Sequence, residues 1–337
     1  MESPGCFAGL ADRRDEWPML SHNLIIEKAA KWMPGSWKRA DALIHRDTTD
    51  FFKLAYGDIL LLDGKAFLIR NSAREGRFGL DDEVKHWVKR AIALDSGELC
   101  IIKLVYYEKF FTRIGGITFE CFRSPRKEAR ILELVRTHPN FMHGLTIADE
   151  KGNPVRILER ISGKTLADHV IDFGQNHEAY FYETLPGILQ NYIKCVKAIE
   201  FLHDHHEKHG DIRRDHILID KHSGHYRWID FDYNYRHREN IYGYDLFGLG
   251  NILAYIIGKG DVLLLDLKRH SPALLDRLTE ADLNIVFRNR VVNLRKIYPY
   301  IPAALNDVLL HFSRGTNWFY EHTRQLIGDL EDAAQGI

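Results

Sequence analysis

Two acidic residues, each next to an apolar run, constrain this chain more than any other feature. Asp211 and Asp230 lie in the stretch from His209 to Asp245, which reads HGDIRRDHILID and, after a short gap, RWIDFDYNYRHRENIYGYD. The runs ILID and YRWIDF predict two short strands around a turn at His222-Ser223-Gly224. Such a hairpin would hold both acids on one rigid edge. One carboxylate there could orient a hydroxyl and take its proton, and the other could hold a divalent metal ion.

The same stretch resembles the catalytic core of protein-kinase-like phosphotransferases. His209-Gly210-Asp211 is similar to their His-Arg-Asp element, in the His-Gly-Asp form of small-molecule kinases, and Asp230-Phe231-Asp232 is similar to Asp-Phe-Gly. Asp245 opens the segment DLFGLGNIL, which resembles the start of the buried helix that follows the activation segment. Each motif is short, and their order and spacing together carry the resemblance. It implies an α+β, two-lobed fold, with a small lobe of antiparallel sheet plus one helix and a larger, mostly helical lobe.

The chain has 337 residues, which is enough for two hydrophobic cores. We expect an N-terminal extension over residues 1–50, the small lobe over 51–161 and the larger lobe over 162–337. Within them, Asp63-Gly64 between two apolar runs predicts a hairpin, and LIIEKAAKWM predicts a short helix. LPGILQNYIKCVKAIEFLHDHH shows the apolar spacing of an amphipathic helix.

Charge and cysteine usage narrow the class of protein. The formal net charge is −1, with 46 basic and 47 acidic residues, so a general affinity for nucleic acid is not expected. The four cysteines form no CxxC pair, which favours free thiols in a reducing compartment. The N-terminus lacks a signal-peptide pattern, and the apolar run near residues 251–257 is too short to span a bilayer. A cytoplasmic protein without a transmembrane segment is the expectation.

Lys103 stands inside the apolar run IIKLV, where a lysine usually extends to the surface or to a sheet edge. The resemblance implies that Lys103 instead grips the phosphates of ATP. SPRKEARILEL predicts a helix capped by Ser124, and Glu128 heads its apolar stripe. Glu128 is either a solvated first-turn acid or, as the resemblance implies, the partner of Lys103. The segment between them carries Gly115-Gly116 and predicts an additional hairpin.

The resemblance implies that two further segments bind the nucleotide. Gly76 and Gly79 resemble the later part of the glycine-rich loop that approaches phosphate oxygens, although Arg74 replaces its first glycine. A hairpin turn without a ligand is the alternative. Backbone groups from Glu159 to Ile161 would bind the adenine edge.

The catalytic roles are implied residue by residue. Asp211 would orient the acceptor hydroxyl and accept its proton, and Arg213 could hold the transferring phosphate with its fork of N–H groups. Asp230 would bind Mg²⁺. His216 stands where the family has a metal-binding asparagine, so the second metal is weakly bound or absent, Mn²⁺ is preferred, or His216 is structural. Asp232, in place of glycine, could add a metal contact.

The histidines near HDHHEKH also raise the possibility of zinc, which the lack of a nearby cysteine disfavours. We expect His203, His205 and His206 to be exposed, and His209 to be buried.

The resemblance therefore implies an ATP-dependent phosphotransferase with Mg²⁺ or Mn²⁺ as cofactor and a hydroxyl acceptor. A serine/threonine protein-kinase-like activity and a small-molecule, lipid or sugar kinase both remain open, because a fold does not choose the acceptor. The second class is favoured by the short span from Asp230 to Asp245, which is only fifteen positions. A nucleotide-binding pseudokinase that acts as a scaffold is the third reading.

Overall fold

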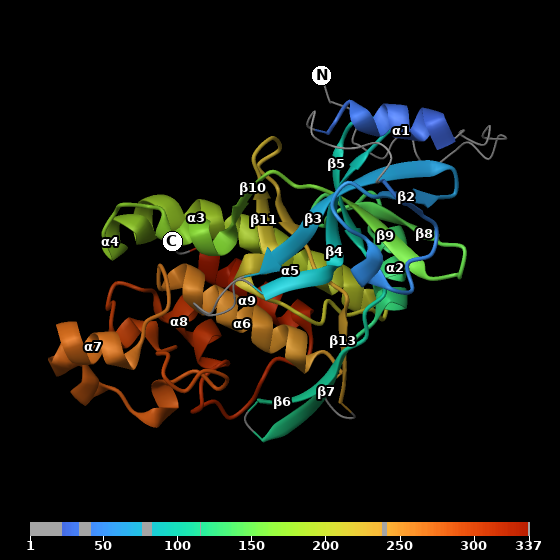
Figure 1. Ribbon diagram of the computed structural model, residues 1–337. Coiled ribbons are helices and arrows are strands. Elements are labelled where there is room, and N and C mark those ends of the chain that lie inside the picture. The colour runs from blue at the N-terminus through green and yellow to red at the C-terminus, as the bar shows by residue number, and fades with distance from the viewer. Residues whose placement is uncertain (1–21, 34–41, 76–82, 115, 238–240, 336–337) are drawn as a thin grey trace. The chain divides into compact units, whose positions relative to one another are not determined.

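The computed structural model describes residues 22–33, 42–75, 83–114, 116–237 and 241–335, and these form a mixed α+β protein (Figure 1). The chain divides into two compact units. The first comprises Met1–Tyr107, Ser124–Thr137 and Met142–Ile161, and the second comprises Glu108–Arg123, His138–Phe141 and Ser162–Ile337. Residues 108–123, which the sequence analysis placed in the small lobe, thus group with the second unit.

The first unit is built on a sheet whose described strands follow the order β1-β2-β3-β4-β5-β9-β8. Neighbouring strands are antiparallel, except that β1 and β2 are parallel. The bounds are Ile44–His45 (β1), Ile59–Leu62 (β2), Lys65–Glu75 (β3), Glu83–Ala93 (β4), Leu99–Lys103 (β5), Gly144–Ala148 (β8) and Pro154–Glu159 (β9). The hairpin predicted at Asp63-Gly64 is confirmed, because β2 pairs with β3 across it.

This sheet is buried on both faces, which explains the unbroken apolar run of β2. Ile59 and Leu61 belong to one core cluster with Ile25 and Ala29 of helix α1 (His22–Ala30), whereas Leu60 and Leu62 belong to a second cluster. Successive side chains of a strand point to opposite faces, so one run of four residues serves both cores. The predicted helix near residue 25 therefore packs on this unit.

Helix α2 (Pro125–Leu134) begins as the sequence predicts. The Ser124 side chain accepts a hydrogen bond from the backbone N–H of Lys127 at 3.3 Å, and Pro125 occupies the first turn. Ile131 and Leu132 are buried, and Glu128 is buried on the same helix. The cap and the apolar stripe thus fix which way Glu128 points.

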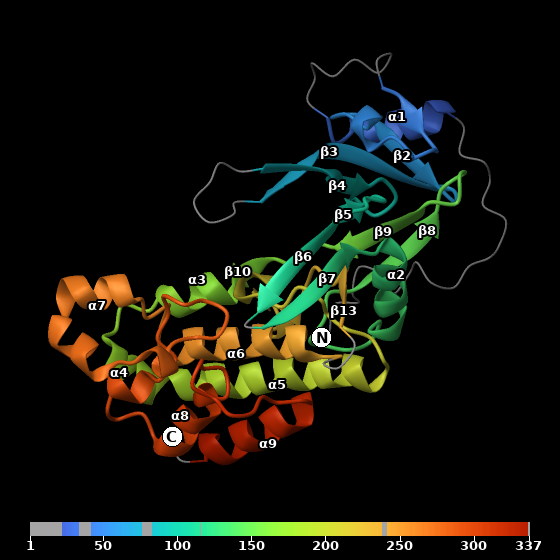
Figure 2. The same ribbon diagram turned by 90° about the horizontal axis from the view of Figure 1, so that it is seen from below.

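The second unit holds the longest helices. Its α-helices are α3 (Leu166–Ile171), α4 (His177–Ala179), α5 (Leu185–Asp204), α6 (Gly243–Ile257), α7 (Leu264–His270), α8 (Ala303–Leu310) and α9 (Thr323–Ala334). Helix α5 contacts both α6 and α9 (Figure 2). The Tyr192 hydroxyl of α5 donates to the backbone oxygen of Leu249 in α6 at 2.6 Å. The amphipathic helix predicted over residues 185–206 is confirmed, with its expected apolar face buried.

Two three-stranded sheets complete the second unit. One has the order β10-β11-β12, with strands Gly163–Thr165 (β10), Ile217–Asp220 (β11) and Tyr226–Trp228 (β12). The other has the order β13-β7-β6, with strands Lys109–Ile114 (β6), Ile117–Arg123 (β7) and Tyr233–Arg236 (β13). Both predicted hairpins, β11–β12 and β6–β7, are therefore present. The pairing of β7 with β13 explains why residues 108–123 belong to this unit.

Between α7 and α8 the chain forms a 3₁₀ helix over Pro272–Arg277 and further short 3₁₀ turns. No helix of the described residues combines the length and the apolar character needed to cross a bilayer.

Gly250 tests the close packing of α6. A Cβ at this position would lie 2.2 Å from Cδ1 of Phe312, so Gly250→Ala should lower the free energy of unfolding by about 1–3 kcal/mol. Gly328→Ala in α9 is the matched control, because a Cβ there meets open space; it should raise stability by about 0.5–1 kcal/mol. Urea denaturation measures both, and equal effects of the two substitutions would contradict this packing.

Candidate active site

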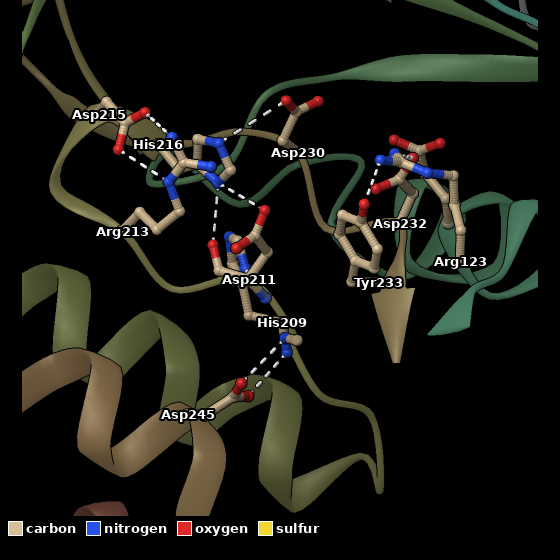
Figure 3. A network of polar contacts seen from close by, with 12 residues as sticks. Arg123, His209, Asp211, Arg213, Asp215, His216, Asp230, Asp232, Tyr233 and Asp245 are labelled. Atoms are coloured by element: carbon tan, nitrogen blue, oxygen red, sulfur yellow. Dashed lines mark hydrogen bonds and ion pairs between the residues drawn. The ribbon is translucent and has the colours of Figure 1, made fainter. Parts of the chain in front are cut away.

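The loop that carries Asp211 is anchored by the carboxylate of Asp245, in the first turn of α6 (Figure 3). Oδ2 of Asp245 accepts the backbone N–H of His209 at 2.8 Å, and Oδ1 accepts the N–H of Gly210 at 2.9 Å. The carboxylate is fully buried. Two consecutive amides thus converge on one ion, which fixes the backbone immediately before Asp211.

His203 of α5 also contacts this carboxylate, with Nε2 donating to Oδ2 of Asp245 at 3.2 Å. His203 is buried, so the expectation that it is exposed was wrong, whereas His205 and His206 are exposed and His209 is buried as expected. Burial alone would raise the pKa of Asp245, but the hydrogen bond and charge of His203 and the amide of Gly210 hold it below its usual value.

Gly210 is required by the local geometry. Its φ is +86°, in the left-handed region, and a Cβ would lie 1.9 Å from the backbone oxygen of Tyr233. Only glycine meets both conditions. The His-Gly-Asp form of the motif therefore has a steric reason in this structure.

His216 lies between Asp211 and Asp230, the two acids predicted to act in the site (Figure 3). Its Nδ1 is 2.8 Å from the backbone oxygen of Asp211 and 3.6 Å from Oδ2 of the same residue. Its Nε2 is 3.8 Å from Oδ2 of Asp230. Because a carbonyl oxygen only accepts, Nδ1 carries a proton and Nε2 is the nitrogen that faces Asp230. The structure brings Asp211, His216 and Asp230 together.

The carboxylate of Asp211 is suited to take a proton. Its side chain keeps 19% of its surface exposed. Burial raises its pKa above the usual value, and the nearby carboxylates of Asp230 and Asp232 act in the same direction against His216 and Arg213. A base with a raised pKa is a stronger acceptor at neutral pH.

Arg213 and Asp232 have partners that the sequence alone does not predict. Arg213 forms a two-point ion pair with Asp215, with Nε donating to Oδ1 at 3.0 Å and Nη2 donating to Oδ2. Asp232, suggested as a further metal contact, is buried and its Oδ2 is bound by Nη1 of Arg123 from β7. The carboxylate of Asp232 thus forms an ion pair with Arg123.

In the first unit, the pair expected between Lys103 and Glu128 is confirmed. Lys103 Nζ donates to Glu128 Oε1 at 2.8 Å, with both side chains almost fully buried. Arg156 of β9 binds the other oxygen, Nε donating to Oε2 at 3.0 Å. Lys103 and Arg156 are opposite each other in the β5–β9 register, so both point to the side of the sheet that receives Glu128. Glu128 therefore has two cationic partners.

The remaining predicted residues contribute less. The N–H of Glu159 donates to the backbone oxygen of His143 at 3.0 Å, so this amide serves the sheet, and adenine binding at Ile161 stays a prediction. Gly76 and Gly79 lie outside the described residues. No group of three or more His, Cys, Asp or Glu side chains in the described ranges is arranged to hold a metal ion unaided.

Arg156, Asp245, Asp215 and Arg123 were missed as site residues. Arg156 had a usable signal, since a charged residue inside the apolar run PVRILE is the same pattern that singled out Lys103. Asp245 is an acid in the first turn of an otherwise apolar helix, which is also visible in the sequence. Arg123 carries no such signal, because its partner lies 109 residues away.

The double partnership of Glu128 makes a test of the first unit. Lys103→Met and Arg156→Met each leave Glu128 with one cation, whereas the double variant leaves a buried charge alone. An uncompensated buried ion costs about 3–5 kcal/mol, and we expect each single variant to lose well below this in the free energy of unfolding. The double variant should lose more than the two single variants combined. Urea denaturation of the four proteins gives this coupling, and additive losses would contradict it.

Asp245 should make stability depend on acid pH. Asp245→Asn removes the charge that two amides and His203 bind, at an expected cost of about 2 kcal/mol near neutral pH. Because the folded-state pKa lies below 3.8, this contribution is present above pH 3.8 and is lost as the pH falls through the folded pKa. Denaturation curves of wild type and variant should converge in that window; a gap that does not change with pH would contradict the assignment.

Comparison with known proteins shows a similarity to a probable kinase over part of the chain. No protein-family profile matches the chain. A curated protein, the probable serine/threonine-protein kinase fhkD of Dictyostelium discoideum, is 27% identical over 132 residues. The match covers 39% of this chain and 16% of that protein, so the chain corresponds to about one sixth of the length of the relative. The chain is therefore similar, over part of its length, to a protein described as a kinase.

Proposed function

We propose that this chain is an ATP-dependent phosphotransferase that moves the γ-phosphate of ATP to a hydroxyl group. The observation that carries the proposal is the placement of Asp211 and Asp230 on either side of His216, on a loop whose backbone is anchored by Asp245. We further propose that the two units are the two lobes of a protein-kinase-like fold. The partial similarity to a probable serine/threonine-protein kinase supports the same reading.

Asp211 is the proposed proton acceptor. Its carboxylate is partly exposed, its pKa is raised by burial, and the anchored amides of His209 and Gly210 limit its movement. Phosphoryl transfer needs positioning more than covalent help, so a fixed carboxylate that orients the acceptor hydroxyl is the main requirement. Arg213 is the proposed phosphate contact, and its pair with Asp215 holds the guanidinium in a defined orientation until a phosphate arrives.

The residues around Asp230 fit a divalent metal ion. The carboxylate of Asp230 is a hard oxygen ligand that suits Mg²⁺, and Nε2 of His216 faces it at 3.8 Å with the proton held on Nδ1. Since Mg²⁺ bound to nucleotide phosphates needs only one or two protein ligands, the lack of a larger ligand cluster in the described residues is compatible with this role. When bound, the metal would neutralise phosphate charge; an imidazole ligand favours Mn²⁺ over Mg²⁺.

The nucleotide is assigned to Lys103 in the first unit. Lys103 and Arg156 together carry two positive charges against one on Glu128, so the cluster keeps a net charge of one that suits a phosphate oxygen.

The acceptor is a hydroxyl compound, with two candidate classes. A protein serine or threonine is favoured by the partial similarity to a probable serine/threonine-protein kinase. A small molecule, lipid or sugar is favoured by the segment after Asp230, which becomes strand β13 almost at once and gives way to α6 at Gly243. This leaves few residues for a peptide-docking platform.

Asp211→Asn tests the proposal. With γ-labelled ATP, Mg²⁺ or Mn²⁺, and pools of peptides and metabolites, wild type should transfer label and Asp211→Asn should lower kcat by about 10²–10⁴-fold. The variant should keep its affinity for ATP, because Lys103 is unchanged. Asp168→Asn, an exposed acid in α3, is the matched control and should transfer normally. Tight ATP binding without transfer by wild type in either metal would instead favour the pseudokinase scaffold.

A further inference from the structure

The hairpin inserted between Lys103 and Glu128 meets the segment that follows Asp230. Strand β7 of this hairpin pairs with β13 (Figure 2). In this pairing Arg123 is directly opposite Tyr233, the first residue of β13. Strands β6, β7 and β13 all belong to the second unit. An insertion and a short segment that are distant in sequence therefore form one sheet beside Asp230.

Arg123 links this sheet to the Asp230-Phe231-Asp232 motif (Figure 3). Its Nη1 donates to Oδ2 of Asp232, and its Nη2 donates to the Tyr233 hydroxyl at 2.6 Å. The guanidinium lies 4.1 Å from the centre of the Tyr233 ring. Nη2 is also 3.4 Å from Glu108, which accepts the Tyr233 hydroxyl at 2.5 Å. One guanidinium thus holds two consecutive residues after Phe231.

Burial makes this contact strong. The side chains of Arg123 and Asp232 retain 5% and 1% of their surfaces. Removal of one member of a buried ion pair leaves an uncompensated charge, so each residue requires the other. The departure of Asp232 from the usual glycine thereby gains a reason, because glycine offers no carboxylate to a guanidinium.

Asp230 itself needs external support. Its φ is +60°, a left-handed conformation that costs a non-glycine residue about 1–2 kcal/mol. Such a conformation persists where its neighbours fix it. On one side, the N–H of Ile229 donates to the backbone oxygen of His216 at 2.9 Å. On the other, Phe231 is fully buried and Asp232 is bound by Arg123.

We propose that Arg123 is a positioning residue that, through Asp232, holds Asp230 in the backbone conformation that binds the metal. The inserted hairpin, which supplies Arg123, and Asp232 then act together to position Asp230. The inference rests on the proposed function, since it assigns Asp230 to a metal. It also adds a statement on regulation: a permanent Arg–Asp pair orders this segment, where a switchable loop would need an added phosphate to pair with arginine.

The test is the affinity for Mn²⁺ in the presence of saturating ATP, measured from the electron paramagnetic resonance signal of free Mn²⁺. Arg123→Met should weaken Mn²⁺ binding about 10-fold or more, which is the usual effect of removing a group that orients a metal ligand. ATP affinity in EDTA, measured by calorimetry, should stay unchanged because Lys103 is untouched. Unchanged Mn²⁺ affinity in a folded Arg123→Met would overturn the proposal.

A double variant separates positioning from charge compensation. Arg123→Met combined with Asp232→Asn removes the buried unpaired carboxylate, so stability should recover while Mn²⁺ binding stays weak. Recovery of wild-type Mn²⁺ affinity would overturn the proposal, because Arg123 would then only neutralise Asp232. Arg290→Met, which breaks a pair with Asp261 elsewhere in this unit, is the matched arginine control and should bind Mn²⁺ as wild type does.

A conservative variant covers the case in which Arg123→Met does not fold. Arg123→Lys keeps the charge but cannot reach Asp232 and Tyr233 with separate N–H groups, so its Mn²⁺ affinity should lie between those of wild type and Arg123→Met. Wild-type affinity in a folded Arg123→Lys, if Arg123→Met does not fold, would count against the proposal. Failure of the wild-type protein to bind Mn²⁺ with ATP would remove the proposed function itself, and the role of Arg123 with it.

Discussion

The buried carboxylate of Asp245 is the interaction on which the rest of the site depends. It accepts two consecutive backbone amides, from His209 and Gly210, and receives a third hydrogen bond from His203. Each of these hydrogen bonds satisfies buried polar groups, which would cost free energy if they were buried without a partner. Because the backbone is fixed at His209 and Gly210, the side chains of Asp211 and His216 project from it in defined directions. The imidazole of His216 thereby lies next to Asp211 and Asp230.

Glu128 and Asp232 repeat this principle with cations in place of amides. Glu128 lies between Lys103 and Arg156 in the first unit, and Asp232 is bound by Arg123 in the second. In each case an arginine from a neighbouring strand supplies a rigid fork that can hold its partner and a further acceptor at once. Buried carboxylates of this kind are costly alone, so they specify which segments must come together as well as which residues do chemistry.

For the proposed reaction, this means that the acidic residues are held in place before the substrates bind. Asp211 has an anchored backbone, Asp230 has a left-handed backbone held on both sides, and Glu128 is bound by Arg156 as well as by Lys103. Preset groups stabilise a transition state without reorganisation at the moment of reaction. The short route from Asp230 to α6 fits the same picture, since it leaves little chain to switch.

The sequence by itself determined the local elements: the β11–β12 hairpin, the cap of α2, the buried face of α5 and the two acids that flank the hairpin. Periodicity, caps and turns are properties of neighbouring residues, so they can be read without the fold. Only the tertiary structure decided that His203 is buried, that Arg156 shares Glu128 and that Arg123 binds Asp232. The partners in these contacts lie 42, 28 and 109 residues apart, and strand register and helix packing bring them together.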